Sequence, residues 1–115
     1  MRIAVLMLAA ALVGLAIAGA AYGHSSPMGW EYSAFCCNGN NHTGDCQPIP
    51  KSSVEATSTG YRITLMPGQH RLVTRKQVFN VAFKAVKESL DEDFHACLYP
   101  TEDKLRCFYA PPMSF

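Results

Sequence analysis

Five cysteines constrain this chain more than any other feature of its sequence. Three gather in the stretch FCCNGNNHTGDC, and two lie near the C-terminus. They are Cys36, Cys37, Cys46, Cys97 and Cys107. In an exported protein such cysteines normally form disulfides, whereas in a reducing compartment they more often bind metal or act in redox chemistry. The compartment in which the chain folds therefore decides how the cysteines are interpreted.

The N-terminal residues carry the pattern of a secretory signal peptide. One basic residue is followed by an unbroken apolar run over 3–18 and then by small residues. This order is typical of a signal peptide over residues 1–23, with cleavage after Ala20, Ala21 or Gly23. The alternative is an uncleaved leader, because the apolar run approaches the length needed to cross a bilayer. We expect a periplasmic or secreted protein that contacts the membrane only if the leader stays uncleaved.

The remaining residues, 24–115, are too few for more than one domain. A chain of this size buries only about 60–65% of the surface that its unfolded form exposes, so its hydrophobic core is small. Small exported domains commonly compensate with disulfides. We therefore expect residues 24–115 to form a single domain that disulfides stabilise.

Charge argues against nucleic acid as a partner. Without Arg2, nine basic and nine acidic residues remain, so the net charge is zero with histidine neutral. The densest basic cluster lies within 71–76, and the acidic run Asp91–Asp93 offsets it. Nucleic-acid-binding domains normally carry a basic patch or stripe. We expect both runs to be solvated surface charge and expect no nucleic-acid partner.

Alternating apolar residues predict a mainly β fold of antiparallel strands. Residues 54–65 alternate on either side of a Ser-Thr-Gly turn, which is typical of a hairpin. The prolines in the stretch 47–50 favour an extended edge segment just before it. Two β-prone runs, 94–99 and 105–110, flank a polar turn and predict a second hairpin near the C-terminus.

The segment 79–90 fits two structures. Phe79, Phe83, Val86 and Leu90 recur at the spacing of one face of a helix. Residues at 79, 81, 83 and 85 alternate equally well as in a strand. We favour a strand in the first half and keep one short helix around 79–90 as the alternative.

The C-terminal hairpin also bears on the cysteine pairing. It would place Cys97 and Cys107 on paired strands, where a cross-strand bridge closes a loop of roughly 10 residues and contributes about 3 kcal/mol in the chain-entropy model. A bridge between the neighbours Cys36 and Cys37 would be strained, so one of the two should bond Cys46 or reach the C-terminal hairpin. The sequence alone does not select among the possible pairings.

Several motifs follow one another along the chain: an HS…WEY segment, CC…DC, PIP, a V…T.TGY hairpin, FHAC and RCFYAPP, which span nearly all of residues 24–115. Together they resemble a family of small exported proteins of alphaproteobacteria. The resemblance implies a signal peptide, a small β-rich domain and cysteines that pair. The family has no assigned activity, so the resemblance implies no catalytic residue.

A metal site is the main alternative to a purely structural use of the cysteines. Zinc is typically held by four cysteine and histidine ligands. Cys36 or Cys37, together with His42 and Cys46, would supply three, and His95 or Cys97 a fourth. The stretch lacks the Cys-x-x-Cys spacing of common zinc sites, and thiols in an exported protein tend to oxidise first.

Copper is a second form of the metal alternative. Cleavage after Gly23 would leave His24 as the first residue, and its α-amine and imidazole would chelate Cu(II) together. A second histidine, His42, His70 or His95, would complete the site. A periplasmic copper- or zinc-binding protein that uses His24, His42 and His95 is therefore the alternative function.

Catalytic motifs are missing from the sequence. It has no nucleophile elbow, no phosphate-binding loop and no carboxylate pair at recognisable spacing. The vicinal Cys36-Cys37 pair is not the Cys-x-x-Cys of thiol oxidoreductases, so a redox role is a weaker alternative. We expect His95 to be half-buried with one structural hydrogen bond, and Trp30, Tyr32 and Phe35 to pack over the core. The chain is thus predicted to be a non-enzymatic, cofactor-free binding domain or envelope accessory factor whose partner is a protein or an envelope ligand.

Overall fold

The computed structural model describes residues 25–37 and 45–112. The predicted signal peptide and two of the predicted metal ligands, His24 and His42, lie outside the described residues. In the described part of the chain, no helix is long and apolar enough to cross a membrane.

Seven strands and two short 3₁₀ helices make up the described part of the chain. In chain order they are β1 (Cys46–Ile49), η1 (Lys51–Ser53), β2 (Val54–Ala56), β3 (Gly60–Leu65), β4 (Gln77–Ala82), η2 (Phe83–Ala85), β5 (Lys87–Glu88), β6 (Phe94–Leu98) and β7 (Leu105–Ala110). The predicted mainly β, disulfide-stabilised fold is confirmed.

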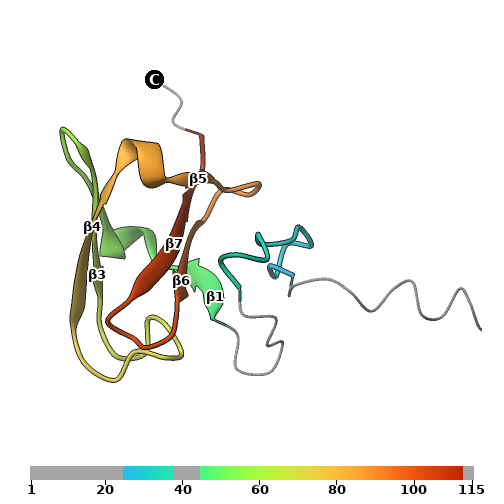
Figure 1. Ribbon diagram of the computed structural model, residues 1–115. Coiled ribbons are helices and arrows are strands. Elements are labelled where there is room, and N and C mark those ends of the chain that lie inside the picture. Colours follow the sequence, from blue (N-terminus) through green and yellow to red (C-terminus); the bar gives the residue numbers. More distant parts are fainter. Residues whose placement is uncertain (1–24, 38–44, 113–115) are drawn as a thin grey trace, which may run out of the picture.

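The strands form two sheets that pack together. One is four-stranded in the order β1-β6-β7-β5, and the other is three-stranded in the order β2-β3-β4. All pairings are antiparallel except that of β5 with β7, which is parallel. Figure 1 shows the three-stranded sheet on one side of β6 and β7 and the N-terminal segment, residues 25–37, on the other. The four-stranded sheet is therefore the middle of three layers.

Both predicted hairpins are present. β2 pairs with β3 and β6 with β7, and Pro48 lies in β1 at the edge of its sheet, as expected. Tyr61, Ile63 and Leu65 share one face of β3 and are buried. Gly60 begins β3 because a Cβ there would lie 1.8 Å from the carbonyl oxygen of Val81 in β4.

The ambiguous segment 79–90 is a strand in its first half. Phe79 and Val81 are partly buried against the core, whereas Val78 and Asn80 are exposed, which is the two-residue period of a strand. The short helix around 79–90 is wrong beyond the single turn of η2, because Leu90 is 68% exposed and leaves the expected apolar stripe incomplete.

The two faces of the four-stranded sheet bury different kinds of side chain. We call the face toward the three-stranded sheet the apolar face; its buried residues are Ile49, Ala96, Leu98, Phe108 and Ala110. We call the opposite face, toward the N-terminal segment, the cysteine face; its buried residues are Cys46, His95, Cys97, Cys107 and Tyr109. Because side chains alternate along a strand, β6 and β7 contribute to both faces.

Two disulfides join the cysteine face to the residues that precede β2. Cys36 bonds Cys107, and Cys46 bonds Cys97. The cross-strand bridge between Cys97 and Cys107 is wrong, although the two residues are directly opposite in the β6–β7 register. Cys107 bonds instead to Cys36 of the N-terminal segment, which lies over this face, and Cys97 bonds to Cys46, its direct neighbour in the β1–β6 register.

Candidate functional site

The structure places all five predicted disulfide candidates in one buried cluster. Cys36 reaches the C-terminal hairpin, which is one of the two partners expected for the vicinal pair, and neither Cys36 nor Cys37 bonds Cys46. Cys37 takes part in neither bridge and is buried. Two disulfides in so short a chain indicate an oxidising, extracytoplasmic environment.

A line of polar groups runs across the cysteine face beside the disulfides. The Tyr32 hydroxyl lies 2.7 Å from Nδ1 of His95, and Nε2 of His95 lies 2.9 Å from Oδ1 of Asp91. The ionised Asp91 carboxylate only accepts hydrogen bonds, so Nε2 donates to it. In the neutral ring Nδ1 is then the acceptor for the Tyr32 hydroxyl.

Asp91 is the most highly coordinated group of this polar line. Its oxygens also accept the Trp30 indole N–H at 2.8 Å, the Ser89 hydroxyl at 3.0 Å and the Asp93 backbone N–H at 2.8 Å. Burial alone would raise the pKa of Asp91, but the hydrogen bonds, that from His95 foremost, outweigh burial and lower the pKa to about 2.

Aromatic rings enclose this polar line. Trp30 lies over Tyr32, His95 and Tyr109 with ring centroids 4.9, 5.0 and 5.3 Å apart. Burial raises the pKa of the Tyr32 hydroxyl, and the nearby Asp91 carboxylate raises it further, so the hydroxyl stays protonated.

The polar line has the residue types of a proton relay, but its tyrosine and its histidine are buried. Tyr32 is 3% exposed and His95 is 0% exposed. His95 is therefore fully buried with hydrogen bonds on both ring nitrogens, and the expected half-buried histidine with one hydrogen bond is wrong. We interpret the line as the polar contact that seats the N-terminal segment on the sheet.

The zinc ligand set predicted from the sequence is wrong. Cys36, Cys46 and Cys97 are oxidised, and disulfide sulfur is not the thiolate that binds zinc. Within residues 25–37 and 45–112, no three histidine, cysteine or acidic side chains are arranged to hold a metal ion. Both ring nitrogens of His95 are already hydrogen-bonded, so it offers no lone pair to copper without losing a partner.

His70, a second possible copper ligand, has a structural role as well. Its Nε2 lies 3.1 Å from the carbonyl oxygens of Asp45 and Ala96, and its Nδ1 accepts the backbone N–H of Leu72. The ring is 1% exposed, and burial lowers its pKa below the ordinary value for histidine. His70 therefore joins the loop after β3 to the four-stranded sheet as a neutral ring.

Of the three aromatic residues that were expected to pack over the core, two do so and one is exposed. Trp30 and Tyr32 pack in the cysteine-face cluster, as expected. Phe35 is 64% exposed and lies under the Arg106 guanidinium, 4.1 Å from its ring centroid, so the prediction that it packs over the core is wrong. The acidic run is also not all solvated surface charge, because Asp91 is the carboxylate of the buried polar line.

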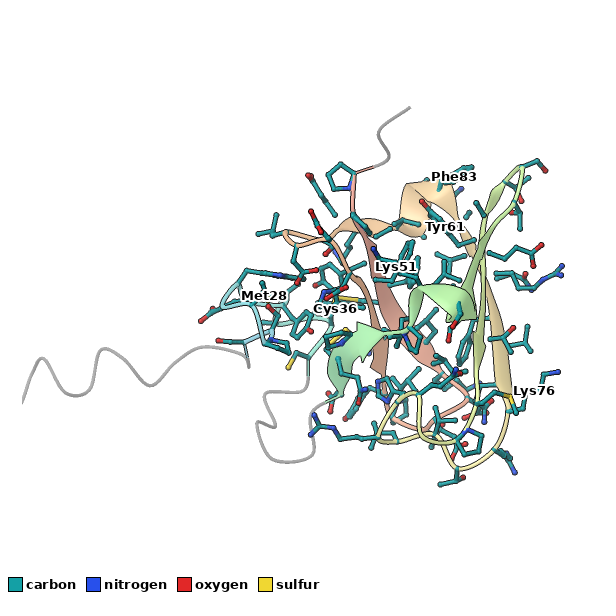
Figure 2. All side chains as sticks on the ribbon, turned by 180° about the vertical axis from the view of Figure 1, so that it is seen from behind. Met28, Cys36, Lys51, Tyr61, Lys76 and Phe83 are labelled. Carbon is teal, nitrogen blue, oxygen red and sulfur yellow. A yellow bond between two sulfur atoms is a disulfide. The ribbon has the colours of Figure 1, made fainter. Side chains whose placement is uncertain are left out.

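An open groove lies between the two sheets on the side away from η1. It has a volume of about 500 Å³, and β4 forms one wall while the first half of β7 forms the other. Its lining residues are Val78–Ala82, Ala85 and Asp103–Phe108. Figure 2 shows Lys76 and Phe83 at opposite ends of β4, which mark the two ends of this wall.

The groove exists because, among the described residues, no further strand pairs with the outer edge of β4 or with the outer edge of the first half of β7. β4 is the last strand of its sheet, and β5 pairs with β7 only through Tyr109 and Ala110. On the opposite side of the molecule, η1 connects β1 directly to β2. The two sheets are thus joined along one side and open along the other, and this open side is the candidate functional site.

This groove could not be predicted from the sequence. Its walls are two strands with ordinary β sequences. Only the order of the strands in the two sheets leaves the facing edges of β4 and β7 open. Comparisons with known proteins give no significant match to a family model, a curated protein or a solved structure. The geometry of the groove is therefore the evidence from which a function is inferred.

Proposed function

We propose that the protein works in the periplasm or outside the cell as a small binding domain or envelope accessory factor, without catalytic activity of its own. The observation that carries this proposal is that two regions of the molecule differ in their access to a partner. The Tyr32–His95–Asp91 line is covered by the N-terminal segment, whereas the groove between β4 and β7 is open to a partner. Concave sites with mixed apolar and polar walls are where proteins usually take ligands.

The disulfides support the same role. Cys36–Cys107 fixes the middle sheet to the N-terminal segment, and Cys46–Cys97 joins β1 to β6 within that sheet; their sequence separations are 71 and 51 residues. They rigidify a small domain outside the reducing cytoplasm, and the Cys36–Cys107 bridge anchors β7, one wall of the groove, through Cys107. A preorganised site binds a partner with less ordering cost than a flexible one.

The test is a selection of phage-displayed peptides on the immobilised oxidised protein. The control is Val78→Arg, which introduces a bulky charged group at a half-exposed position of the groove wall without disturbing the core. We expect enriched peptides that bind the native protein and lose binding to the control. If no peptide is enriched, or if enriched peptides bind both proteins equally, the groove is not a binding site and the proposal fails.

Export has its own test. N-terminal sequencing of the protein recovered from the envelope or the medium should give a chain that begins after Ala20, Ala21 or Gly23. An intact leader on a membrane-bound product would instead establish the anchored alternative.

A further inference from the structure

The edge of β4 offers a row of main-chain hydrogen-bonding groups to the groove. In the β3–β4 register, Tyr61, Ile63 and Leu65 oppose Val81, Phe79 and Gln77. The hydrogen bond from Phe83 N–H to the Thr59 carbonyl continues this ladder, so it shows which alternate residues of β4 bond to β3. The alternate residues Val78, Asn80 and Ala82 therefore point their N–H and C=O groups away from β3, because antiparallel ladders alternate in this way.

This edge carries none of the features that usually prevent strand addition. Its sequence is QVFNVA, with no charged residue and no proline. Natural edge strands are normally protected by lysine, proline, a bulge or a covering element. An uncharged edge of β-prone residues beside an open groove is suited to accept an added strand.

The charges around the groove select the partner. Lys76 precedes β4, Lys84 follows it in η2, and Lys104 lies on the opposite wall, all of them exposed. His95–Asp91 is the one ion pair among the described residues, so none of these lysines forms an ion pair there. The Thr101 hydroxyl and, less strongly, the charge of Lys104 lower the pKa of the neighbouring Asp103. The single acidic residue of the lining, Asp103, already accepts the Thr101 hydroxyl. Acidic residues at the ends of a bound segment would complement the three lysines.

A second copy of the chain fits this edge less well. The antiparallel self-pairing that uses all three outward residues, Val78, Asn80 and Ala82, is centred on Asn80. It places Lys76 opposite Lys84 of the second copy, and like charges directly opposite each other are destabilising. The charge pattern therefore favours a different chain over self-association.

We propose that the groove between β4 and β7 binds an extended peptide segment, with an uncharged β-prone centre and acidic flanks, that adds to β4 as an extra strand. The proposal rests on the proposed binding function and names its partner class. Main-chain hydrogen bonds to Val78, Asn80 and Ala82 supply the affinity, and the lysines supply the preference for acidic flanks.

The experiment uses a fluorescent peptide with a Val-Thr-Val-Thr-Val centre and two glutamates at each end. Asn80→Pro removes one outward N–H but no main-chain bond to β3, and Asn80→Ala is the matched control that keeps the N–H. Both variants lose the side-chain hydrogen bond that Asn80 accepts from Arg62 in β3, so this loss does not distinguish them. We expect Asn80→Pro to weaken binding about fivefold and Asn80→Ala to leave it within about twofold, because a lost main-chain hydrogen bond contributes about 1 kcal/mol. Equal binding by the two variants overturns strand addition.

Variants of the peptide keep the test valid if Asn80→Pro does not fold. N-methylation at alternate residues removes the donors from one edge of the peptide only. We expect one of the two alternating patterns to abolish binding to the native protein and the other to preserve it, and an equal effect of both patterns overturns strand addition.

Charge is tested by exchange. The same centre flanked by lysines should bind about fivefold more weakly than the glutamate peptide, and the double variant Lys76→Glu, Lys84→Glu should reverse this order. If the order does not change, acidic flanks are not recognised. A concentration-dependent dimer that Asn80→Pro abolishes would assign the edge to a second copy instead.

The failure of this inference is distinguishable from the failure of the proposed function. Peptides that the selection enriches, that lose binding to Val78→Arg and that bind Asn80→Pro normally would keep the groove as a binding site and exclude strand addition. A selection without groove-dependent peptides would exclude both.

Discussion

The two faces of the four-stranded sheet are stabilised in different ways. On the apolar face, Phe108 packs against Phe94 and Tyr61 with ring centroids 5.8 and 5.4 Å apart, and a whole sheet covers the cluster. On the cysteine face, a short segment without regular strands is the cover, and it is held by a disulfide, hydrogen bonds and the edge-to-face contact of Trp30 with His95. A cover too small to bury a large apolar area is thus compensated by covalent and directional contacts.

The largest expected effect is on the apolar face. Phe108→Ala removes a ring that is 1% exposed at the centre of the cluster, and it should lower the free energy of unfolding by about 3–5 kcal/mol. Urea unfolding of the oxidised protein measures this loss. A loss below about 1 kcal/mol would mean that the two sheets are not packed through this residue.

Removal of the Cys36–Cys107 disulfide tests the covalent contact of the other face. The double variant Cys36→Ser, Cys107→Ser should lower the free energy of unfolding by about 3 kcal/mol, because the bridge restricts the unfolded chain. Hydrogen exchange should show faster exchange over residues 25–37 while β6 and β7 stay protected. Equal deprotection of β3 and β4 would contradict the separate roles of the two faces.

The hydrogen bond between Tyr32 and His95 is expected to contribute less. Tyr32→Phe keeps the ring that packs under Trp30 and removes the hydroxyl, so Nδ1 of the buried His95 loses its partner. We expect a loss of about 1–2 kcal/mol in urea unfolding. As a control, Glu31→Gln alters an exposed neighbour and should change stability by no more than about 0.5 kcal/mol.

Acid should weaken the cysteine face through Asp91. The pKa of Asp91 is lowered from 3.8 to about 2 in the folded protein, so its contribution is complete above the unfolded value and is lost as the pH falls toward 2. In Asp91→Asn this part of the pH dependence should disappear, while the stability at neutral pH is lower. Identical slopes of unfolding free energy against pH between 4 and 2 would show that Asp91 is not responsible.

Local patterns predicted most of the strands because the cause of each lies within a few residues. The alternation at Tyr61, Ile63 and Leu65 identified the buried face of β3, and the two runs around Pro100 identified the β6–β7 hairpin. The segment 79–90 was ambiguous because its apolar residues fit two periods. The packing of Phe79 and Val81 against the core selected the strand.

The candidate sites were harder to predict because they depend on contacts between distant residues. Asp91 belongs to an acidic run that resembles surface charge, and only the position of Tyr32 and Trp30 over His95 turns it into a buried acceptor. The groove depends on the order of the strands, which no single segment specifies.

The sequence by itself determined that this is a small β-rich domain that folds around paired cysteines. Alternation, proline positions and cysteine number are properties of short segments, so they are visible without a structure. Only the tertiary structure decided which cysteines pair. Cys97 and Cys107 lie opposite each other, yet Cys107 bonds Cys36 of the N-terminal segment, which lies over the cysteine face, and Cys97 bonds Cys46, which is opposite it in β1. Disulfide pairing depends on which thiols meet in space, and in this protein that was decided by the packing of residues 25–37 on the sheet and by the pairing of β1 with β6.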